Sequence, residues 1–277
     1  MKKIVVIGDL MVDVFISGRV ERISPESPVP VINPEQKNIK LGGAANVAEN
    51  ISTLGDEVLL VSVVGNDDNG KIAQSELDKT SINSKLIKDL SRITTTKTRF
   101  VSGGSHLLRV DYEDVHQCDE KIILNKLNEE VSDLNNQIII CSDYEKGVFR
   151  NGLIKRLNAL NTLTFVDPKT DDIERYRNSY LLKPNHHELN KIIERHSQNC
   201  IENDRSIKVF DLMLNYGITH IIETRGHLGA TWYNQGTVRN FPPPLDVQVY
   251  DVVGAGDTFL ASLVSELRKS NDMTVAI

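Results

Sequence analysis

The chain has 277 residues, a formal net charge of −6 and few aromatic residues. This length can bury a substantial core in one large α/β domain or in two small ones. The acidic balance and the lack of a long basic run exclude a typical nucleic-acid surface, and three cysteines without a Cys-x-x-Cys pair indicate neither a disulfide framework nor a zinc site.

The first apolar run, residues 4–7, is β-branched throughout and predicts a parallel strand that is covered on both faces. Asp9 interrupts the run too early for a signal peptide or a membrane span, so we expect a cytoplasmic protein without a membrane partner. Asp9 and Asp13 follow the carboxyl end of this strand, where open α/β sheets place their ligands.

Residues 14–41 and 95–112 consist of short alternating pieces, and the first segment carries four prolines. Prolines at this density favour edge strands outside the core sheet. In the second segment, Thr98, Phe100, Leu108 and Val110 can line one apolar face, which a second subunit would cover. We therefore expect a homodimer.

Residues 42–46, Gly-Gly-Ala-Ala-Asn, open a predicted helix with small side chains. Small residues let a ligand approach the backbone, and Asn46 offers a donor and an acceptor to hydroxyl groups. Close packing of the helix on a sheet would require the same small residues. The clustering of Gly42 and Gly43 at the mouth of the helix favours the binding role.

Apolar runs alternate with helical stretches along the rest of the chain, which predicts a mostly parallel sheet with right-handed crossovers. The predicted strands are 58–64, 137–141, 163–166, 180–182 and 218–222. The predicted helices are 71–79, 120–134, 152–160, 188–195 and 206–214. Polar residues follow four of these strands and define a rim: Asp143 and Lys146, Asp167 and Lys169, Asn185 and Glu188, and Thr224, Arg225 and Gly226.

Asn185 and Glu188 stand three apart at the start of a predicted helix. The pattern fits a capping box, and it also fits a pair of oxygen ligands that hold Mg²⁺ through water. The loop from Thr224 to Gly229 has a similar ambiguity, because its glycines suit either a phosphate-binding loop or a hairpin turn.

Residues 254–258, Gly-Ala-Gly-Asp-Thr, join a predicted strand at Val247–Tyr250 to an apolar helix. Two glycines at a helix start expose N–H donors at the positive end of the helix dipole, which predicts an anion site. Asp257 beside that site suits a base that takes a proton from a hydroxyl attacking a phosphate. Alternatively, Asp257 only complements the helix dipole.

The Gly254–Thr258 and Gly42–Asn46 stretches resemble the two signatures of the ribokinase-like (PfkB) carbohydrate kinases. Residues 22–31 and 142–147 look like those of kinases that act on D-glycero-β-D-manno-heptose 7-phosphate. The resemblance implies a three-layer α/β/α fold with a mostly parallel sheet and a small β-sheet lid, formed by residues 14–41 and 95–112 of a single domain spanning 1–277. It also implies ATP and Mg²⁺ as cofactors, together with a monovalent cation.

The resemblance further implies roles for individual residues. The catalytic group would be Asp257, with Gly254, Ala255 and Gly256 in the turn that forms the anion hole. The sugar side would comprise Asp13, Gly42, Gly43, Asn46 and Asp143. The nucleotide side would comprise Lys169, Asn185, Thr224, Arg225, Gly226 and Gly229, with Mg²⁺ near Asn185 and Glu188. The distal phosphate of the sugar needs cations, for which Arg109 and Lys146 are the candidates ahead of Arg22, although all three also suit surface positions.

The expected activity is phosphorylation of the anomeric hydroxyl to give the 1,7-bisphosphate, for ADP-heptose and lipopolysaccharide core synthesis. The family usually continues some tens of residues past the last helix, so we expect the C-terminal end of its fold to be missing here. A Rossmann-type dehydrogenase is disfavoured because the Gly254 loop lacks a third glycine and the acid that follows about 20 residues later. Another PfkB-type sugar kinase, or a non-catalytic sugar or nucleotide sensor, would carry the same motifs.

Overall fold

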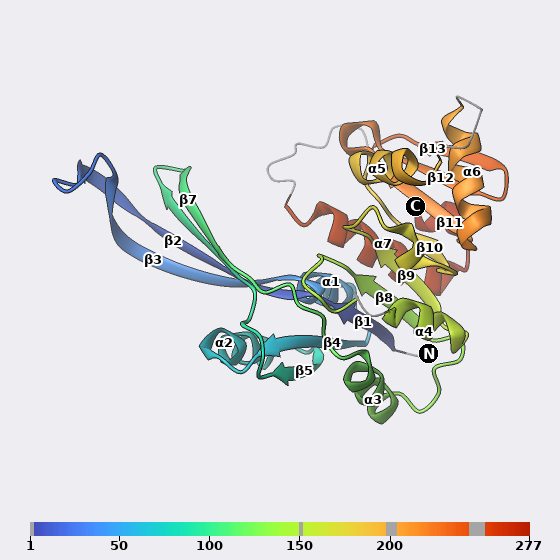
Figure 1. Ribbon diagram of the computed structural model, residues 1–277, viewed down its shortest axis with the longest axis horizontal. Helices are drawn as coiled ribbons and strands as arrows, with labels where there is room; N and C mark the ends of the chain where they lie inside the picture. Colours follow the sequence, from blue (N-terminus) through green and yellow to red (C-terminus); the bar gives the residue numbers. More distant parts are fainter. Residues whose placement is uncertain (1–2, 150–151, 198–203, 244–252) are drawn as a thin grey trace.

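The computed structural model describes residues 3–149, 152–197, 204–243 and 253–277. It contains a nine-stranded sheet in the order β13-β12-β11-β10-β9-β8-β1-β4-β5 and a separate four-stranded sheet in the order β3-β2-β6-β7 (Figure 1). Neighbours from β11 to β5 pair in parallel, and β12 and β13 are antiparallel. The predicted α/β class with a mostly parallel sheet is confirmed.

The nine-stranded sheet is formed by β1 (Ile4–Gly8), β4 (Val58–Gly65), β5 (Asn83–Asp89), β8 (Ile138–Ser142), β9 (Leu163–Asp167), β10 (Leu181–Leu182), β11 (His220–Thr224), β12 (Ala230–Asn234) and β13 (Thr237–Phe241). The helices are α1 (Ala44–Thr53), α2 (Asp68–Leu77), α3 (Glu120–Glu130), α4 (Leu153–Ala159), α5 (His186–His196), α6 (Arg205–Tyr216), α7 (Ala255–Ser270) and α8 (Met273–Ala276), with short 3₁₀ turns η1 (Ile173–Tyr176) and η2 (Gly226–Leu228).

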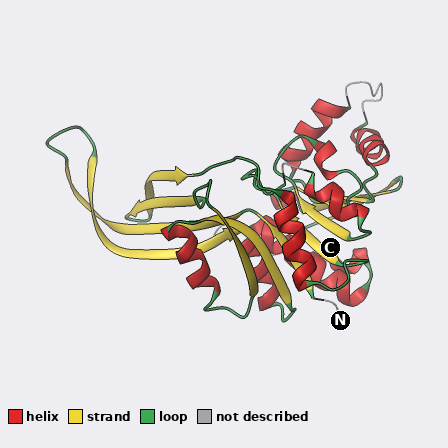
Figure 2. Ribbon diagram, turned by 60° about the horizontal axis from the view of Figure 1, so that its bottom comes forward, coloured by secondary structure: helices red, strands yellow, loops and turns green. Residues whose placement is uncertain are grey.

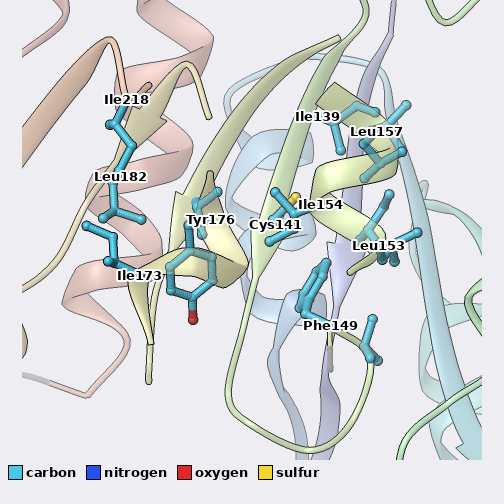
Figure 3. Close-up of a cluster of buried hydrophobic side chains, with 14 of the residues drawn as sticks. Ile139, Cys141, Phe149, Leu153, Ile154, Leu157, Ile173, Tyr176, Leu182 and Ile218 are labelled. Carbon is cyan, nitrogen blue, oxygen red and sulfur yellow. The ribbon is translucent and has the colours of Figure 1, made fainter. Parts of the chain in front are cut away.

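Each face of this sheet carries its own core because successive strand residues point to opposite sides. In β1, Val5 and Ile7 join the core under α3, α4, α5 and α6. Ile4 and Val6 join the core under α1, α2, α7 and α8. Figure 3 shows part of the first core, in which Phe149, Leu153 and the buried Cys141 pack together. The arrangement is the expected three-layer α/β/α architecture.

The four-stranded sheet is formed by β2 (Leu10–Ile23), β3 (Pro30–Gly43), β6 (Thr96–Ser102) and β7 (Ser105–Tyr112), and we call it the lid sheet. It projects away from the helical layers (Figures 1 and 2). β3 is an edge strand, which explains how it accommodates Pro30 and Pro34. β2 starts one residue after β1 ends, so a single extended segment connects the central sheet to the lid sheet.

The predicted elements differ from the structure mainly at the two edges of the nine-stranded sheet. The short edge strands β5 and β13 were not predicted, since their sequences are polar and lack an apolar run. The strand predicted at Val247–Tyr250 and the cysteine Cys200 lie outside the described residues. Within the described ranges, no helix is long and apolar enough to cross a membrane.

Candidate active site

The first turn of α7 lies between two clefts, each of ≈ 380 Å³. Gly254 precedes the helix in the left-handed conformation, with φ 77°, which favours glycine. Gly254 and Asp257 line the first cleft. Ala255, Gly256 and Phe259 line the second. One helix start therefore faces both spaces, as a site that joins two substrates requires.

Asp257 is buried, with 3% of its surface exposed, and two side chains from other elements hold its carboxylate. The amide of Asn46 in α1 donates to Oδ2 at 2.7 Å, and the hydroxyl of Tyr144 donates to Oδ1 at 2.9 Å. Burial raises the pKa of Asp257, whereas these hydrogen bonds and the charge of Lys183 lower it. Each oxygen keeps a lone pair for a further donor.

The first cleft is bounded by the lid sheet and is rich in cations. Asp13 and Arg99 form an ion pair across β2 and β6, and the side chain of Asp13 packs against Gly42, where an added Cβ would lie 2.5 Å from Oδ2. Lys97 is half-buried in the cleft wall, and burial lowers its pKa. Lys40 and His106 also line this cleft, and the positive charges of Lys40 and Lys97 suit an anion.

A buried cation lies behind the glycine turn. Lys183, only 3% exposed, pairs with Asp167 at 3.0 Å. An added Cβ on Gly256 would stand 3.3 Å from Nζ of Lys183. Burial raises the pKa of Asp167 to about 6, although the charge of Lys183 opposes the shift. Lys183 thus adds positive charge to the N–H groups of the helix start.

Glycines and apolar side chains line the second cleft. Thr224, Gly226 and Gly229 line it beside Phe241 and Phe259. Gly229 has φ 80°, and an added Cβ there would lie 2.0 Å from the carbonyl oxygen of Phe241. The tight turn at Gly229 therefore brings the predicted loop against β13.

Asn185 and Glu188 form the complete capping box at the start of α5, with both hydrogen bonds 2.9 Å long. Lys169 also lies 3.2 Å from Oε1 of Glu188. Within the described ranges, no three His, Cys, Asp or Glu side chains converge on a common metal position. Because carboxylate and amide oxygens accept more than one hydrogen bond, the pair fits a hydrated Mg²⁺ held through water. The cap and the metal role are therefore compatible.

Several predicted residues lie outside the cleft walls. Arg109 is exposed and pairs with Asp111 at 2.9 Å, and Lys146 pairs with Glu113 at 2.8 Å. Asp143 is buried, where it accepts hydrogen bonds from Tyr176 and Arg175. Arg22 lies on the exposed distal part of β2, and Arg225 contacts Asn240 at 3.2 Å.

Cleft or anchoring residues that were not predicted include Lys97, Arg99, Tyr144 and Lys183. Two signals in the sequence could have found three of these residues. The alternation that assigns Thr98 and Phe100 to one face of β6 puts Lys97 and Arg99 on the other. Lys183 directly follows a buried strand, at the same rim as Asp167.

The chain matches the pfkB family carbohydrate kinase description over residues 1–277. It is 37% identical over 273 residues to the bifunctional protein HldE of a Caulobacter species, covering 96% of this chain and 55% of that protein. It is 36% identical over 284 residues to HldE of Helicobacter pylori, covering 100% of this chain and 60% of that protein. The chain thus spans little more than half the length of these relatives.

Solved structures share the fold at low sequence identity. Arabidopsis thaliana ribokinase complexed with ribose and ATP matches with a TM-score of 0.73 and 17% identity, over 99% of this chain and 88% of that one. Escherichia coli phosphofructokinase-2 in complex with potassium matches with a TM-score of 0.77 and 17% identity, over 99% and 88%. These likenesses bear on the fold alone.

Proposed function

This chain belongs to the pfkB family of carbohydrate kinases, and we propose that it transfers the terminal phosphoryl group of ATP to D-glycero-β-D-manno-heptose 7-phosphate. The acceptor is the anomeric hydroxyl, and the products are the 1,7-bisphosphate and ADP. The identity of 34% to 37% with HldE proteins supports this choice within the family, as do the heptose-kinase-like segments 22–31 and 142–147. The coarser activity, phosphoryl transfer to a sugar hydroxyl, follows from the family.

One observation carries the proposal: the buried carboxylate of Asp257 lies at a helix start that faces both clefts. The sugar would occupy the first cleft and the nucleotide the second. As the sugar oxygen bonds to the γ-phosphorus, the bond from that phosphorus to the β-bridging oxygen breaks, ADP leaves, and the hydroxyl proton passes to Asp257. An anomeric hydroxyl is more acidic than an ordinary alcohol, so a carboxylate suffices as the base.

The N–H groups of Ala255, Gly256 and Asp257 are the proposed anion hole for the phosphoryl oxygens. They belong to the first turn of α7, where the backbone donors have no partner within the helix. Lys183 supplies a buried positive charge behind Gly256. Together these groups offset the negative charge that phosphoryl transfer spreads over the equatorial oxygens.

On the nucleotide side, we assign Thr224, Gly226 and Gly229 to the phosphates and the apolar wall at Phe241 and Phe259 to the base. Lys169, paired with Glu188, and Arg225, next to Thr224, are also assigned to the nucleotide side. Asn185 and Glu188 would hold Mg²⁺ through water, and the ion would neutralise charge on the β- and γ-phosphates.

The distal phosphate of the sugar is assigned to Lys97 and Arg99, with Lys40 beside them. These cations line the first cleft, whereas Arg109 and Lys146 pair with acids elsewhere. Among the described residues, Lys97 makes no ion pair, so its charge is available to a ligand. Because cations recognise the phosphate and not the carbon skeleton, a related sugar phosphate is the second candidate substrate.

An ADP-release assay with a panel of sugar phosphates and their unphosphorylated sugars tests the proposal. We expect turnover with the heptose 7-phosphate and at least tenfold lower kcat/KM with each other sugar. If activity were highest on another phosphosugar, the proposed substrate would be wrong but the assignment as a kinase would stand. Binding of sugar and ATP without ADP release from any of them would instead identify a sensor.

We further propose that the product enters ADP-heptose and lipopolysaccharide core synthesis, and that the chain forms a homodimer through the lid sheet. The exposed Leu108 and the half-buried Val110, facing Phe100 and Thr98 across β6 and β7, form part of the surface such a dimer would cover. Light scattering on the protein and on a Leu108→Glu variant tests the dimer, which the charge should dissociate.

A further inference from the structure

Tyr144, in the segment 142–147, contacts the proposed base, a role that the sequence alone did not assign to it. Its hydroxyl donates to Oδ1 of Asp257 at 2.9 Å, and its side chain lines the sugar cleft. Building on the proposed function, we propose that Tyr144 is a positioning residue that fixes the carboxylate of Asp257 against the acceptor hydroxyl. The proton of Tyr144 stays on its own oxygen throughout.

The hydroxyl of Tyr144 is a permanent donor. Burial raises the pKa of Tyr144 above its usual value, and the charges of Asp257 and Asp167 raise it further. A group that cannot ionise at working pH can give a hydrogen bond to the carboxylate but cannot replace it as the base. Tyr144 and Asn46, one on each oxygen, thus set the plane of the carboxylate and leave the remaining lone pairs for the substrate.

The loop that carries Tyr144 is anchored by a buried acid. Asp9 accepts hydrogen bonds from the backbone N–H groups of Tyr144 at 2.8 Å, Lys146 at 3.0 Å and Val148 at 3.3 Å. Three bonds to one carboxylate fix the loop to the end of β1. The position of the Tyr144 hydroxyl is therefore determined by the core of the protein and not by the cleft surface.

The same loop has a backbone that few sequences could adopt. Glu145 has φ 59°, and Gly147 has φ 107° with its Cα so close to His116 that an added Cβ would lie 2.0 Å from the carbonyl oxygen. Arg92, which is buried, donates to the carbonyl oxygen of Lys146 from the other side. A strained loop held from both sides is what accurate placement of one side chain requires.

Loss of the Tyr144 hydroxyl has a predictable electrostatic result. The charged groups that act on Asp257 are Lys183, which favours its ionised form, and Asp167, which opposes it; Glu188 acts on Asp167 and Tyr144. In Tyr144→Phe, the amide of Asn46 is the remaining side-chain hydrogen-bond donor to Asp257 among the described residues. The pKa of Asp257 should therefore rise.

The test compares Tyr144→Phe with the parent protein and with Tyr216→Phe, which removes a tyrosine hydroxyl hydrogen-bonded to His196 at the C-terminal end of α6. For Tyr144→Phe we expect the acid limb of the kcat profile to move up by about one to two pH units. The plateau kcat should fall about tenfold, while KM for the sugar stays within about threefold. Tyr216→Phe should leave both unchanged.

A measurement without turnover separates this inference from the proposed substrate. The ¹³C-carboxyl signal of Asp257, assigned by its loss in Asp257→Asn, should titrate at higher pH in Tyr144→Phe than in the parent. That shift would support the positioning role even if the heptose phosphate proved to be the wrong substrate. An unchanged titration, or a variant that alters only thermal stability, would overturn it.

Discussion

The amide of Asn46 donates a 2.7 Å hydrogen bond to Oδ2 of Asp257, although 211 positions separate the two residues. The two signature segments of the chain therefore meet in one contact. The sequence suggested that Asn46 would bind sugar hydroxyls, but part of its hydrogen-bonding capacity is directed at the proposed base. Its amide oxygen retains a lone pair that can accept a hydrogen bond from a sugar.

Replacing Asp257 by Asn should lower kcat by about 10²- to 10⁴-fold, because the amide cannot accept the proton of the acceptor hydroxyl. The size and the polar character of the side chain are retained, so the thermal unfolding midpoint should change little. Steady-state kinetics and calorimetry on the same preparation check both parts. Retention of full turnover would dismiss the assignment of Asp257 as the base.

Replacing Gly254 by Ala should reduce turnover at least tenfold, since the new Cβ would lie 2.8 Å from Nδ2 of Asn46 and displace it from Asp257. Gly236→Ala is the matched control. Gly236 also has a positive φ, 85°, but no atom lies within 4 Å of its added Cβ. Both variants should lose about 1 to 2 kcal/mol of stability, because a residue with a Cβ is strained in the left-handed conformation, and only Gly254→Ala should lose activity.

Replacing Glu188 by Gln separates the metal role from the capping role, because Gln can still reach the backbone N–H of Asn185. We expect an unchanged unfolding midpoint and a several-fold higher Mg²⁺ concentration for half-maximal activity, measured by titration at saturating ATP. A lower midpoint with an unaltered Mg²⁺ titration would assign Glu188 to the cap alone.

Replacing Lys97 by Ala should raise KM for the phosphorylated sugar by about 10- to 100-fold. This is the loss of affinity expected when one hydrogen bond to a charged group is removed. KM for ATP should not change, because Lys97 lies in the first cleft. Arg109→Ala is the control from the same lid sheet. A larger effect of Arg109→Ala than of Lys97→Ala would return the phosphate site to Arg109.

Asp9 should make the stability of the protein depend on pH. Burial, with a smaller contribution from Asp143, raises its pKa from 3.8 to about 6. The Asp9 carboxyl group therefore binds a proton more tightly in the folded state than in the unfolded chain. The stability that this proton binding contributes is present below about pH 4 and is lost as the pH rises through about 6. The Asn side chain in Asp9→Asn does not titrate, so this variant serves as the reference. The difference in thermal unfolding midpoint, parent minus variant, should decrease between about pH 5 and about pH 7.5.

Much of the fold could be predicted because it depends on local pattern. The apolar runs of β1, β4, β8, β9 and β11 are buried, and the proline-rich stretch forms the edge strand β3. β5 escaped prediction because an edge strand buries little and its sequence, Asn-Ser-Lys-Leu-Ile-Lys-Asp, alternates weakly.

The site was predictable only where a motif is contiguous. The turn at Gly254 and the capping box at Asn185 can be read from neighbouring residues. Tyr144 and Lys183 reach the site from other strands, so their roles depend on sheet order and loop geometry that a sequence does not state. Asn46 illustrates the same difficulty, since its partner is set by the packing of α1 on α7.

The way in which β2 leaves β1 limits how the lid sheet can move. The one residue between the strands, Asp9, donates its N–H to Ser142 and accepts a hydrogen bond from the N–H of Ala44, so the joint has no slack. The β2–β3 hairpin of the lid sheet is fixed where it joins the central sheet. It can bend along its length, but it cannot rotate as a rigid body about a hinge at Asp9. The resistance of this hairpin to movement is therefore set by the long strands β2 and β3. A ligand that draws the end of the hairpin toward the cleft must bend these strands along their length, as far as Asp13.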